Sequence, residues 1–256
     1  MKRIESTQNT VIKELAKLHR KKERDRQNRF LIEGAHMLQE AAQAGLLQEV
    51  FVLEGQDIPD YISDRLITEC TAPVLHKLSL LDSGTSLIGV AVHPDGRLPE
   101  APDRILLLDS VQDPGNLGTL IRSAFSFGVQ LVICSEDCAD PFGPKALQSS
   151  QGAVFHIPVI RCRLSEAVEK LKKRMPVLAA ALHQDSTSLS DLDISGPWAL
   201  MLGNEGQGIR ESLIRQCTET VFIEMDAFES LNVAVAGSIL MYCLRYRQSP
   251  DSCRKS

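Results

Sequence analysis

The sequence predicts an α/β protein with a mostly parallel sheet covered by helices on both faces, preceded by a smaller α/β unit. Apolar runs of strand length alternate with amphipathic helical stretches along most of the 256 residues. The segment "PDGRLPEAPD" at 94–103, with three prolines and a glycine, interrupts this alternation. We therefore expect domains at 1–95 and 104–247, a linker at 96–103 and a tail at 248–256.

The first domain opens with a helical stretch. Val11, Ile12, Leu15 and Leu18 recur at helical spacing and predict a helix from Asn9 to about Arg26. Further elements are expected as a strand at 29–34, a helix at 36–45, a strand at 49–55 and a strand at 87–93.

Positive charge is concentrated at the start of the chain. Residues 1–30 hold ten Lys/Arg and four Asp/Glu, a net charge of +6, whereas the remainder carries −11. Phosphate binding depends on where the basic side chains cluster, so this segment could lie along a nucleic-acid backbone. A solvated helix with internal ion pairs is an equal alternative. The candidate nucleic-acid-binding residues are Lys13, Lys17, Arg20, Lys21, Lys22, Arg24 and Arg29.

The second domain repeats the alternation of strands and helices. Strands are expected at 104–111, 129–135, 155–160, 176–182, 197–203 and 220–225. Helices are expected at 117–127, 143–150, 164–174, 209–216 and 231–247. Ligands of such folds bind in the loops that follow the carboxyl ends of the strands. Three of these loops have unusual content.

The first loop lies in "LLLDSVQDPGNLGTLIRSAFSFG" at 106–128. Its helix has an apolar stripe that runs from Leu117 to Phe125 and ends at Gly128. Asn116 is placed to cap this helix or to serve in a site. Arg122 lies off the stripe, so it is either solvent-exposed or turned toward a cleft. The glycine spacing does not make a dinucleotide-binding fingerprint.

The second loop, "GNEGQG" at 203–208, has three glycines that free the backbone to wrap a small molecule. Glu205 lies within this loop and could accept hydrogen bonds from a ligand or hold an arginine. A flexible strand-to-helix turn is the alternative.

The third loop precedes the helix expected at 231–247. Ser230 is a natural N-cap for that helix, and Asn232 could cap it or bind a ligand. Together the three loops offer an arginine, a carboxylate, two asparagines and a serine. That inventory suits a reaction in which a cofactor supplies the reactive group and the protein supplies position.

Metal chemistry is not indicated by the sequence. The seven cysteines are scattered mostly in apolar stretches, the six histidines are dispersed, and no spacing completes a zinc set. We expect reduced, buried thiols and no metal. The N-terminus has no apolar core of the kind that a secretory signal needs, which favours a cytoplasmic protein.

The order of the motifs resembles that of a known family. "DPGNLGTLIRSAFSFG", "GNEGQGI" and "SLNVAVA" resemble the three signature motifs of the SpoU family of the SPOUT superfamily, over roughly 104–247. "SSQGAVFHIPV" at 149–159 fits the segment between the first two motifs. Residues 1–95 resemble the family's RNA-binding domain, which is related to a ribosomal protein fold.

The resemblance implies ribose 2′-O-methylation of structured RNA with S-adenosyl-L-methionine as cofactor. It also implies a trefoil knot and a homodimer with active sites at the subunit interface. Ribosomal RNA is favoured over transfer RNA as the partner. A non-catalytic RNA-binding protein on the same scaffold is the alternative, and the complete polar set speaks against it. The missing fingerprint speaks against a dehydrogenase.

Residue roles carry over from the motifs. The polar positions that match catalytic residues are Asn116, Arg122, Glu205, Ser230 and Asn232. The positions that match cofactor-binding residues are Leu202, Gly203, Gly208, Ile223, Met225 and Leu231. Glu224 departs from the family, which usually has proline there, and the stretch from Ile223 to Leu231 is one residue shorter than usual. The cofactor loop is therefore expected to differ in shape.

Overall fold

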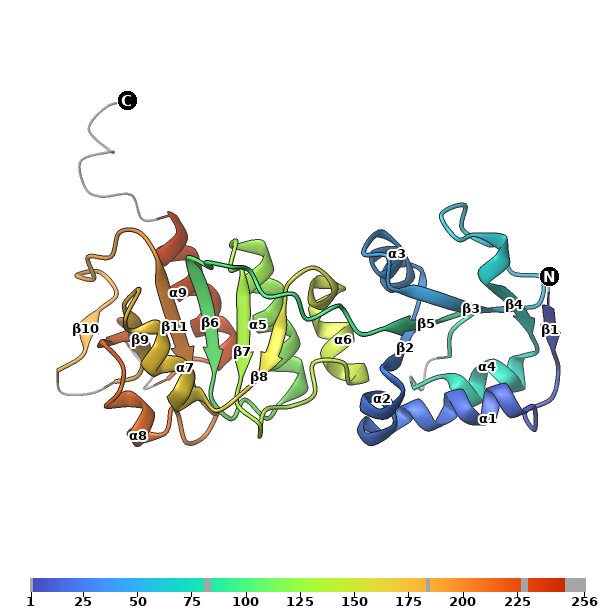
Figure 1. Cartoon of the computed structure of the whole chain (residues 1–256), viewed down its shortest axis with the longest axis horizontal. Coiled ribbons are helices and arrows are strands. Elements are labelled where there is room, and N and C mark those ends of the chain that lie inside the picture. Colours follow the sequence, from blue (N-terminus) through green and yellow to red (C-terminus); the bar gives the residue numbers. More distant parts are fainter. Residues whose placement is uncertain (1, 81–83, 183–184, 227–229, 247–256) are drawn as a thin grey trace, which may run out of the picture. The chain divides into compact units, whose positions relative to one another are not determined.

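The computed structural model describes residues 2–80, 84–182, 185–226 and 230–246. These residues form two compact units (Figure 1). The first unit spans Met1–Asp95 and also takes in Phe142–His156, and the second spans Gly96–Pro141 and Ile157–Ser256. The expected domain bounds instead place residues 142–156 in the second domain.

The first unit is built on a five-stranded sheet of order β1-β4-β3-β5-β2. Its strands are β1 (Lys2–Ile4), β2 (Arg29–Glu33), β3 (Leu47–Leu53), β4 (Ile67–Cys70) and β5 (Leu87–Val92). Strands β1, β4 and β3 run parallel, whereas β5 is antiparallel to both β3 and β2. Its elements outside the sheet are α1 (Thr10–Ala16), η1 (Lys17–His19), α2 (Lys21–Gln27), α3 (Ala35–Gln43), η2 (Asp64–Leu66) and α4 (Ala72–Leu78).

The helix expected from Asn9 to Arg26 is wrong in one respect, because the chain breaks it into α1, η1 and α2. Arg20 between η1 and α2 has extended backbone angles. The Arg24 side chain stabilises this break, because its Nη1 donates to the carbonyl oxygens of Leu18 (2.9 Å) and His19 (3.0 Å). Carbonyls that a continuous helix would pair internally are thereby satisfied by a side chain.

The segment from Phe142 to His156 packs on the first sheet. It contains α6 (Pro144–Ser150) and the turn η3 (Ala153–Phe155). Phe142 and Phe155 contact Phe30 of β2, with ring centroids 5.0 and 5.9 Å apart. His156 Nε2 lies 2.8 Å from Glu40 Oε2 of α3. The strand expected at 155–160 is therefore wrong at its start and is confined to β8 (Val159–Arg161).

The second unit contains a seven-stranded parallel sheet of order β10-β12-β9-β11-β6-β7-β8. Its strands other than β8 are β6 (Arg104–Leu108), β7 (Leu131–Cys134), β9 (Val177–Ala180), β10 (Thr187–Ser188), β11 (Trp198–Leu202) and β12 (Glu219–Phe222). The sequence-based prediction of a mostly parallel sheet after a smaller α/β unit is confirmed. The strand order does not test the knot, which stays a prediction.

Helices cover both faces of this sheet (Figure 1). They are α5 (Pro114–Ser126), α7 (Leu164–Leu171), α8 (Glu211–Ile214) and α9 (Val233–Tyr246). Helices α7 and α8 bury Val168 and Leu213 in one apolar core with the sheet. Helices α5 and α9 pack together on the other face, where Gly237 of α9 lies against Leu202 of β11 and Leu120 of α5. No helix in the described part of the chain is long and apolar enough to cross a membrane.

The register of β6 and β11 brings the site loops together. Leu108 and Leu202, the last residues of these neighbouring strands, are register partners. The Asp109 N–H then donates to the Leu202 carbonyl oxygen at 2.8 Å. The loops that begin at Asp109 and Gly203 therefore leave the sheet side by side, at its carboxyl edge.

One of the cysteines lies beside these loops, since Cys138 Sγ donates to the Leu108 carbonyl oxygen at 3.2 Å. Six cysteines are free thiols; Cys70, Cys134 and Cys138 are buried, and the others are half-buried. The seventh, Cys253, lies outside the described residues. No group of three or more potential ligands among the described His, Cys, Asp and Glu residues could hold a metal ion.

Candidate functional site

The first site loop ends in a capped helix. Asp113 is the N-cap of α5, and its Oδ1 accepts a hydrogen bond from the Asn116 N–H at 2.9 Å. Pro114 follows at the first helical position, where its fixed φ and missing N–H suit a helix start. Of the two roles expected for Asn116, helix capping is therefore excluded, and its side chain is left for other contacts.

Side chains from all three loops meet in one hydrogen-bonded chain. Asn116 Nδ2 donates to Glu205 Oε1 at 3.0 Å, and Asn232 Nδ2 donates to Asn116 Oδ1 at 3.0 Å. Asn232 Oδ1 in turn accepts from the N–H groups of Ala234 (2.9 Å) and Val235 (3.3 Å). Asn232 thus caps α9, and the expectation that Ser230 does so is wrong.

The donor and acceptor at each step of this hydrogen-bonded series follow from the groups at its two ends. A carboxylate only accepts, so the amide nitrogen of Asn116 must face Glu205. The N–H groups at the start of α9 only donate, so the amide oxygen of Asn232 must face them. The two asparagines between these ends are therefore fixed in one orientation each. Glu205 also accepts from the N–H groups of Asp113 (3.2 Å) and Gln112 (3.4 Å).

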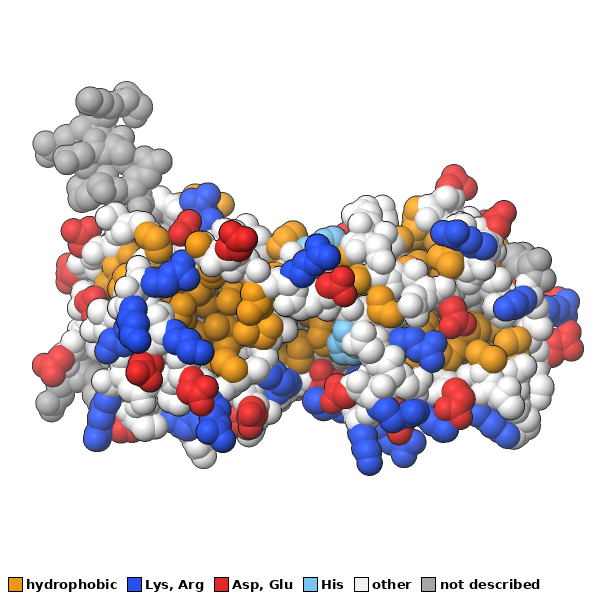
Figure 2. Space-filling view, in the orientation of Figure 1, with side chains coloured by type: hydrophobic (Ala, Val, Ile, Leu, Met, Phe, Trp, Pro, Cys, Tyr) orange, Lys and Arg blue, Asp and Glu red, His pale blue; other side chains and the backbone are white. Residues whose placement is uncertain are grey.

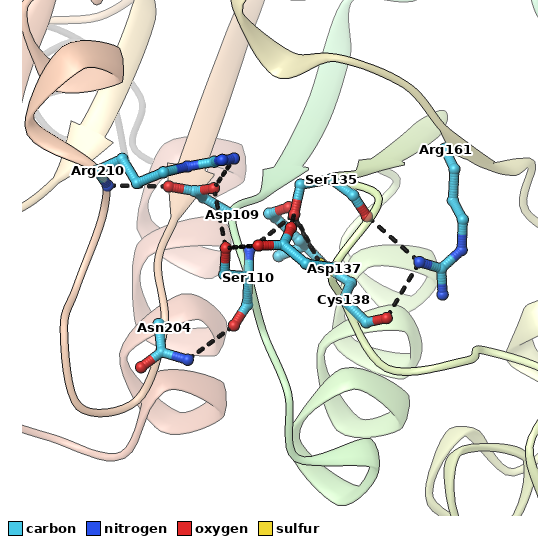
Figure 3. Close-up of polar contacts among 9 residues, drawn as sticks. Asp109, Ser110, Ser135, Asp137, Cys138, Arg161, Asn204 and Arg210 are labelled. Atoms are coloured by element: carbon cyan, nitrogen blue, oxygen red, sulfur yellow. Dashed lines mark hydrogen bonds and ion pairs between the residues drawn. The ribbon is translucent and has the colours of Figure 1, made fainter.

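A second set of contacts fastens the glycine-rich loop to the end of β6 (Figure 3). Asp109, whose side chain is fully buried, accepts from the Arg210 N–H at 2.9 Å and from Arg210 Nη2 at 2.5 Å. Asn204 Nδ2 donates to the Ser110 carbonyl oxygen at 2.8 Å, and its Oδ1 accepts from Gly206 N–H and Gln207 N–H. Both ends of the loop are thus anchored.

The neighbouring loop after β7 is held by the same cluster. Asp137 accepts hydrogen bonds from Ser110 Oγ at 2.6 Å and from Ser135 Oγ at 2.5 Å (Figure 3). Arg161 of β8 donates to four carbonyl oxygens between Ser135 and Ala139, at 2.6 to 3.3 Å. Asp109, Asp137, Arg161 and Arg210 were not anticipated from the sequence. Asp109 directly follows β6 and Arg161 ends β8, so their position at strand ends was an available signal. Asp137 and Arg210 lie farther along their loops, where the sequence offered no such signal.

A cavity of about 660 Å³ opens between β9, β12 and α9. The predicted residues Ile223, Met225, Ser230 and Leu231 line it, together with Ala181 and Leu182 of the loop after β9 and Ala236 of α9. Leu182 is 71% exposed and Met225 40% exposed, so the cavity presents apolar side chains to a ligand. Its volume lies within the range of about 300–1,000 Å³ usual for small-molecule sites and suits a nucleoside-sized molecule.

The loop leaves no room for a side chain at Gly203. A Cβ built on Gly203 would lie 2.2 Å from both the Gly208 carbonyl carbon and the Ile209 nitrogen. The loop closes on itself there through paired hydrogen bonds between Asn204 and Gly208. Leu202, Gly203 and Gly208 are not among the residues that line the cavity, and Leu202 is buried against α9.

We expect Gly203→Ala to destabilise the protein by about 1–3 kcal/mol, because the added methyl meets backbone atoms that cannot rotate away. The affinity for S-adenosylmethionine, the cofactor that the resemblance implies, should fall as well. Urea denaturation and titration calorimetry measure the two effects. Gly206→Ala is the matched control, since its Cβ would meet only Asn204 Oδ1 at 3.7 Å. Equal behaviour of the two variants would contradict the prediction.

Hydrogen bonding controls the charge of Glu205. Partial burial by itself raises the pKa of this carboxyl, but hydrogen bonds from Asn116 and from backbone N–H groups outweigh the burial. The pKa of Glu205 therefore lies below its ordinary value of 4.5. The site holds a carboxylate at neutral pH.

The lowered pKa predicts a pH-dependent contribution to stability. A folded-state pKa below the unfolded one stabilises the protein above the unfolded value, and this stabilisation is lost as the pH falls through the folded pKa. Wild type should therefore be more stable than Glu205→Gln at pH 7, and the difference should shrink below about pH 4.5. Urea denaturation between pH 3.5 and 7 measures it. A difference that stays constant over this range would contradict the assignment.

Arg122 lies apart from the three joined residues. It is exposed on α5, six residues after Asn116, and makes no hydrogen bond or ion pair with any residue that the structure describes. Within one chain, the structure thus brings together Asn116, Glu205 and Asn232, places Ser230 in the cavity and leaves Arg122 on the surface.

The basic residues of the first unit are distributed over α1, η1, α2 and β2. Figure 2 shows Lys and Arg side chains along the edge formed by α1 and α2, interspersed with carboxylates. Lys13, Arg20, Lys21 and Lys22 are exposed, and Lys17 and Arg29 are half-buried. Arg24 differs, because it is 5% exposed and donates to Leu18 and His19. The expectation that Arg24 lies on an RNA-binding surface is therefore wrong, and its role is structural.

Family models match both units. The description "SpoU rRNA Methylase family" matches residues 103–242, and "MRM3-like substrate binding domain" matches residues 9–89. A 23S rRNA (guanosine(2553)-2′-O)-methyltransferase, RlmP, of Bacillus subtilis (strain 168) is 36% identical over 250 residues, covering 96% of this chain and 100% of that protein.

Solved structures agree along the whole chain. An RNA 2′-O ribose methyltransferase superimposes with a TM-score of 0.80 at 34% identity, covering 96% of this chain and 99% of its own. An AdoMet-bound rRNA methyltransferase from Sinorhizobium meliloti gives a TM-score of 0.83 at 26% identity, covering 97% and 98%.

Proposed function

We propose that this chain, which belongs to the SpoU rRNA methylase family, methylates the 2′-hydroxyl of a guanosine ribose in 23S ribosomal RNA. The chain is an RNA ribose 2′-O-methyltransferase that uses S-adenosylmethionine. A relative that covers 96% of the chain is named for a guanosine of 23S rRNA, which supports the choice of ribosomal over transfer RNA. Since ribosomal RNA is its substrate, we place the enzyme in the cytoplasm.

The observation that carries the proposal for the site is the series of side-chain hydrogen bonds that joins Glu205, Asn116 and Asn232. It joins the three motif loops at the carboxyl edge of the sheet through two side-chain hydrogen bonds of 3.0 Å. We assign Asn116, Glu205 and Asn232 the task of holding these loops in the geometry that the reaction needs. Fixed polar groups of this kind lower a barrier because little reorganisation is needed when the substrate reacts.

The apolar cavity fits the cofactor. Ile223, Met225 and Leu231 would surround its adenosine part, and Ser230 would supply a hydroxyl at the same wall. Gly203 and Gly208 act one step away, by closing the loop that carries Glu205. When bound, S-adenosylmethionine supplies a methyl carbon that its sulfonium already activates. The protein's remaining task is to hold the 2′-oxygen in line with that carbon.

Arg122 supplies the positive charge for this oxygen. A ribose hydroxyl is a poor nucleophile at neutral pH, and a fixed guanidinium beside it favours the developing alkoxide. Arginine remains protonated up to a pKa of about 12 or beyond, so it acts by electrostatic stabilisation rather than as a base. The freedom of Arg122 from partners in the described chain leaves its guanidinium available for this role.

A second copy of the chain completes the site in this proposal. Helices α5 and α9 expose Phe125 (45%), Val235 (49%), Tyr242 (55%) and Tyr246 (52%), large apolar side chains that a symmetric partner would cover. Arg122 lies on the same pair of helices. Sedimentation velocity at micromolar concentration should show one species of twice the 28.2 kDa chain mass. A monomer would contradict the dimer.

The substrate is tested by mapping 2′-O-methylated riboses in RNA from cells with and without this gene. One position of 23S rRNA should lose its methyl group in the deletion, and purified protein with S-adenosylmethionine should restore it. Loss of a methyl group from a transfer RNA instead, with ribosomal RNA unchanged, would overturn the choice of substrate.

A further inference from the structure

A second cavity, of about 290 Å³, lies entirely within the first unit. It is formed where the end of β2 and the start of α3 face α6. Leu31, Met37 and Leu147 line it with buried apolar side chains. Its volume is at the lower end of the range for small-molecule pockets, so it suits one ring system rather than a larger ligand.

Polar side chains border the same cavity. The ring of His36 and the side-chain amide of Gln148 have no hydrogen-bond partner among the described residues. Gln151 Nε2 donates to the Gln148 carbonyl oxygen at 2.7 Å, which leaves its own amide oxygen available to accept. Gln151 also has a φ of 50°, a left-handed conformation that is uncommon for residues other than glycine. Donors and acceptors are therefore presented beside an apolar surface.

The charge at the cavity argues against an anion. Glu33 lines the wall, where its carboxylate accepts hydrogen bonds from Ser79 Oγ at 2.8 Å and from the Leu80 N–H at 2.5 Å. A fixed carboxylate repels phosphate but can accept a hydrogen bond from an exocyclic amine. The cavity thus favours a neutral, flat heterocycle with polar edges.

We propose that this cavity binds one unstacked nucleobase of the RNA substrate. The proposal rests on the assignment of RNA as the substrate. Sequence-specific RNA recognition uses bases splayed from single-stranded regions, stacked on side chains and hydrogen-bonded at their edges. His36 and Met37 offer surfaces for stacking, and Gln148 and Gln151 contact the edges. Lys21 and Lys22 are exposed on α2 of the same unit and could contact RNA phosphates, although Lys21 Nζ also pairs with Asp25 at 2.5 Å.

Three substitutions test the cavity without disturbing the fold. Gln148→Ala and Gln151→Gly remove the amides at exposed positions, and glycine accepts the positive φ of residue 151 without strain. Ala35→Phe adds a ring at an exposed position that lines the cavity. Each should raise the KM for an unmodified 23S rRNA transcript about ten-fold, the size expected for loss of one hydrogen bond or one stacking contact to a base. The kcat and the affinity for S-adenosylmethionine should not change.

Gln39→Ala and Gln39→Phe are the matched controls, because Gln39 is exposed on α3 and does not line the cavity. Single abasic positions in the transcript give an independent test. One position should raise the KM about ten-fold with wild type and have no further effect with Ala35→Phe.

The failure of this proposal can be distinguished from failure of the substrate assignment. If wild type methylates the transcript and the cavity variants match it in KM and in filter-binding affinity, the nucleobase proposal is wrong and the enzyme assignment stands. If wild type fails to methylate the transcript, the substrate assignment is wrong. Filter binding to the same transcript then still decides whether the cavity contributes to RNA binding.

Discussion

Arg122→Lys is expected to lower kcat by about 100- to 1,000-fold while leaving the affinity for S-adenosylmethionine unchanged. Stability should not change, because Arg122 is exposed on α5 and its side chain has no partner in the described chain. Lysine keeps the positive charge but loses the planar, delocalised guanidinium and its fixed fork of donors. Steady-state kinetics with a 23S rRNA transcript, combined with calorimetry for the cofactor, separates the two parameters.

The control for this variant is Arg174→Lys, an exposed arginine of the same unit. It should keep wild-type kcat. If Arg122→Lys also kept near-wild-type turnover across the pH range, the role assigned to the guanidinium would be wrong. A variant that failed to dimerise would point to an interface role instead, so sedimentation should accompany the kinetics.

Arg210→Gln is expected to destabilise the protein by about 3 kcal/mol. Removing one partner of a buried ion pair leaves an uncompensated charge and costs about 3–5 kcal/mol. The lower end applies because the Arg210 side chain is 53% exposed and its backbone N–H still donates to Asp109. Asp109 itself is fully buried, so its carboxylate cannot turn to water. The midpoint of urea denaturation measures the change.

Arg215→Gln, one helical turn farther along, is the control for Arg210→Gln because it removes an exposed ion pair. Arg215 pairs with Glu211 at 3.1 Å, but both side chains are largely exposed, at 76% and 52%. Such surface pairs contribute about 0–1 kcal/mol. Equal destabilisation by the two substitutions would show that Asp109 does not depend on Arg210.

The sequence predicted the parallel sheet because its strands are apolar on both faces and alternate with helices. Periodicity could place the three motif loops at one edge of that sheet, which the register of Leu108 and Leu202 confirms. It could not tell which side chain caps α5. Asn116 and Asp113 are both good N-cap residues, and only the proline at 114 separates them in favour of Asp113.

Other features depend on contacts that no local pattern encodes. Nothing in the sequence distinguishes one basic residue near the N-terminus from another. Arg24 nevertheless turns inward and donates to the carbonyl oxygens of Leu18 and His19. Residues 142–156 lie within the sequence of the second domain, but Phe142 and Phe155 pack on Phe30, which is far away in the sequence. Burial of this kind is decided by the tertiary arrangement and cannot be read from spacing.

The bond between Asn232 and Asn116 spans 116 residues, so the three motif loops cannot be joined until the ribosome has synthesised Asn232. At a ribosomal rate of about 5–20 residues per second, the second asparagine emerges roughly 6–23 s after the first. The segment Phe142–His156 is synthesised within that interval, so the first unit can be completed before the catalytic centre is assembled. A polypeptide released before Asn232 would occupy RNA without modifying it.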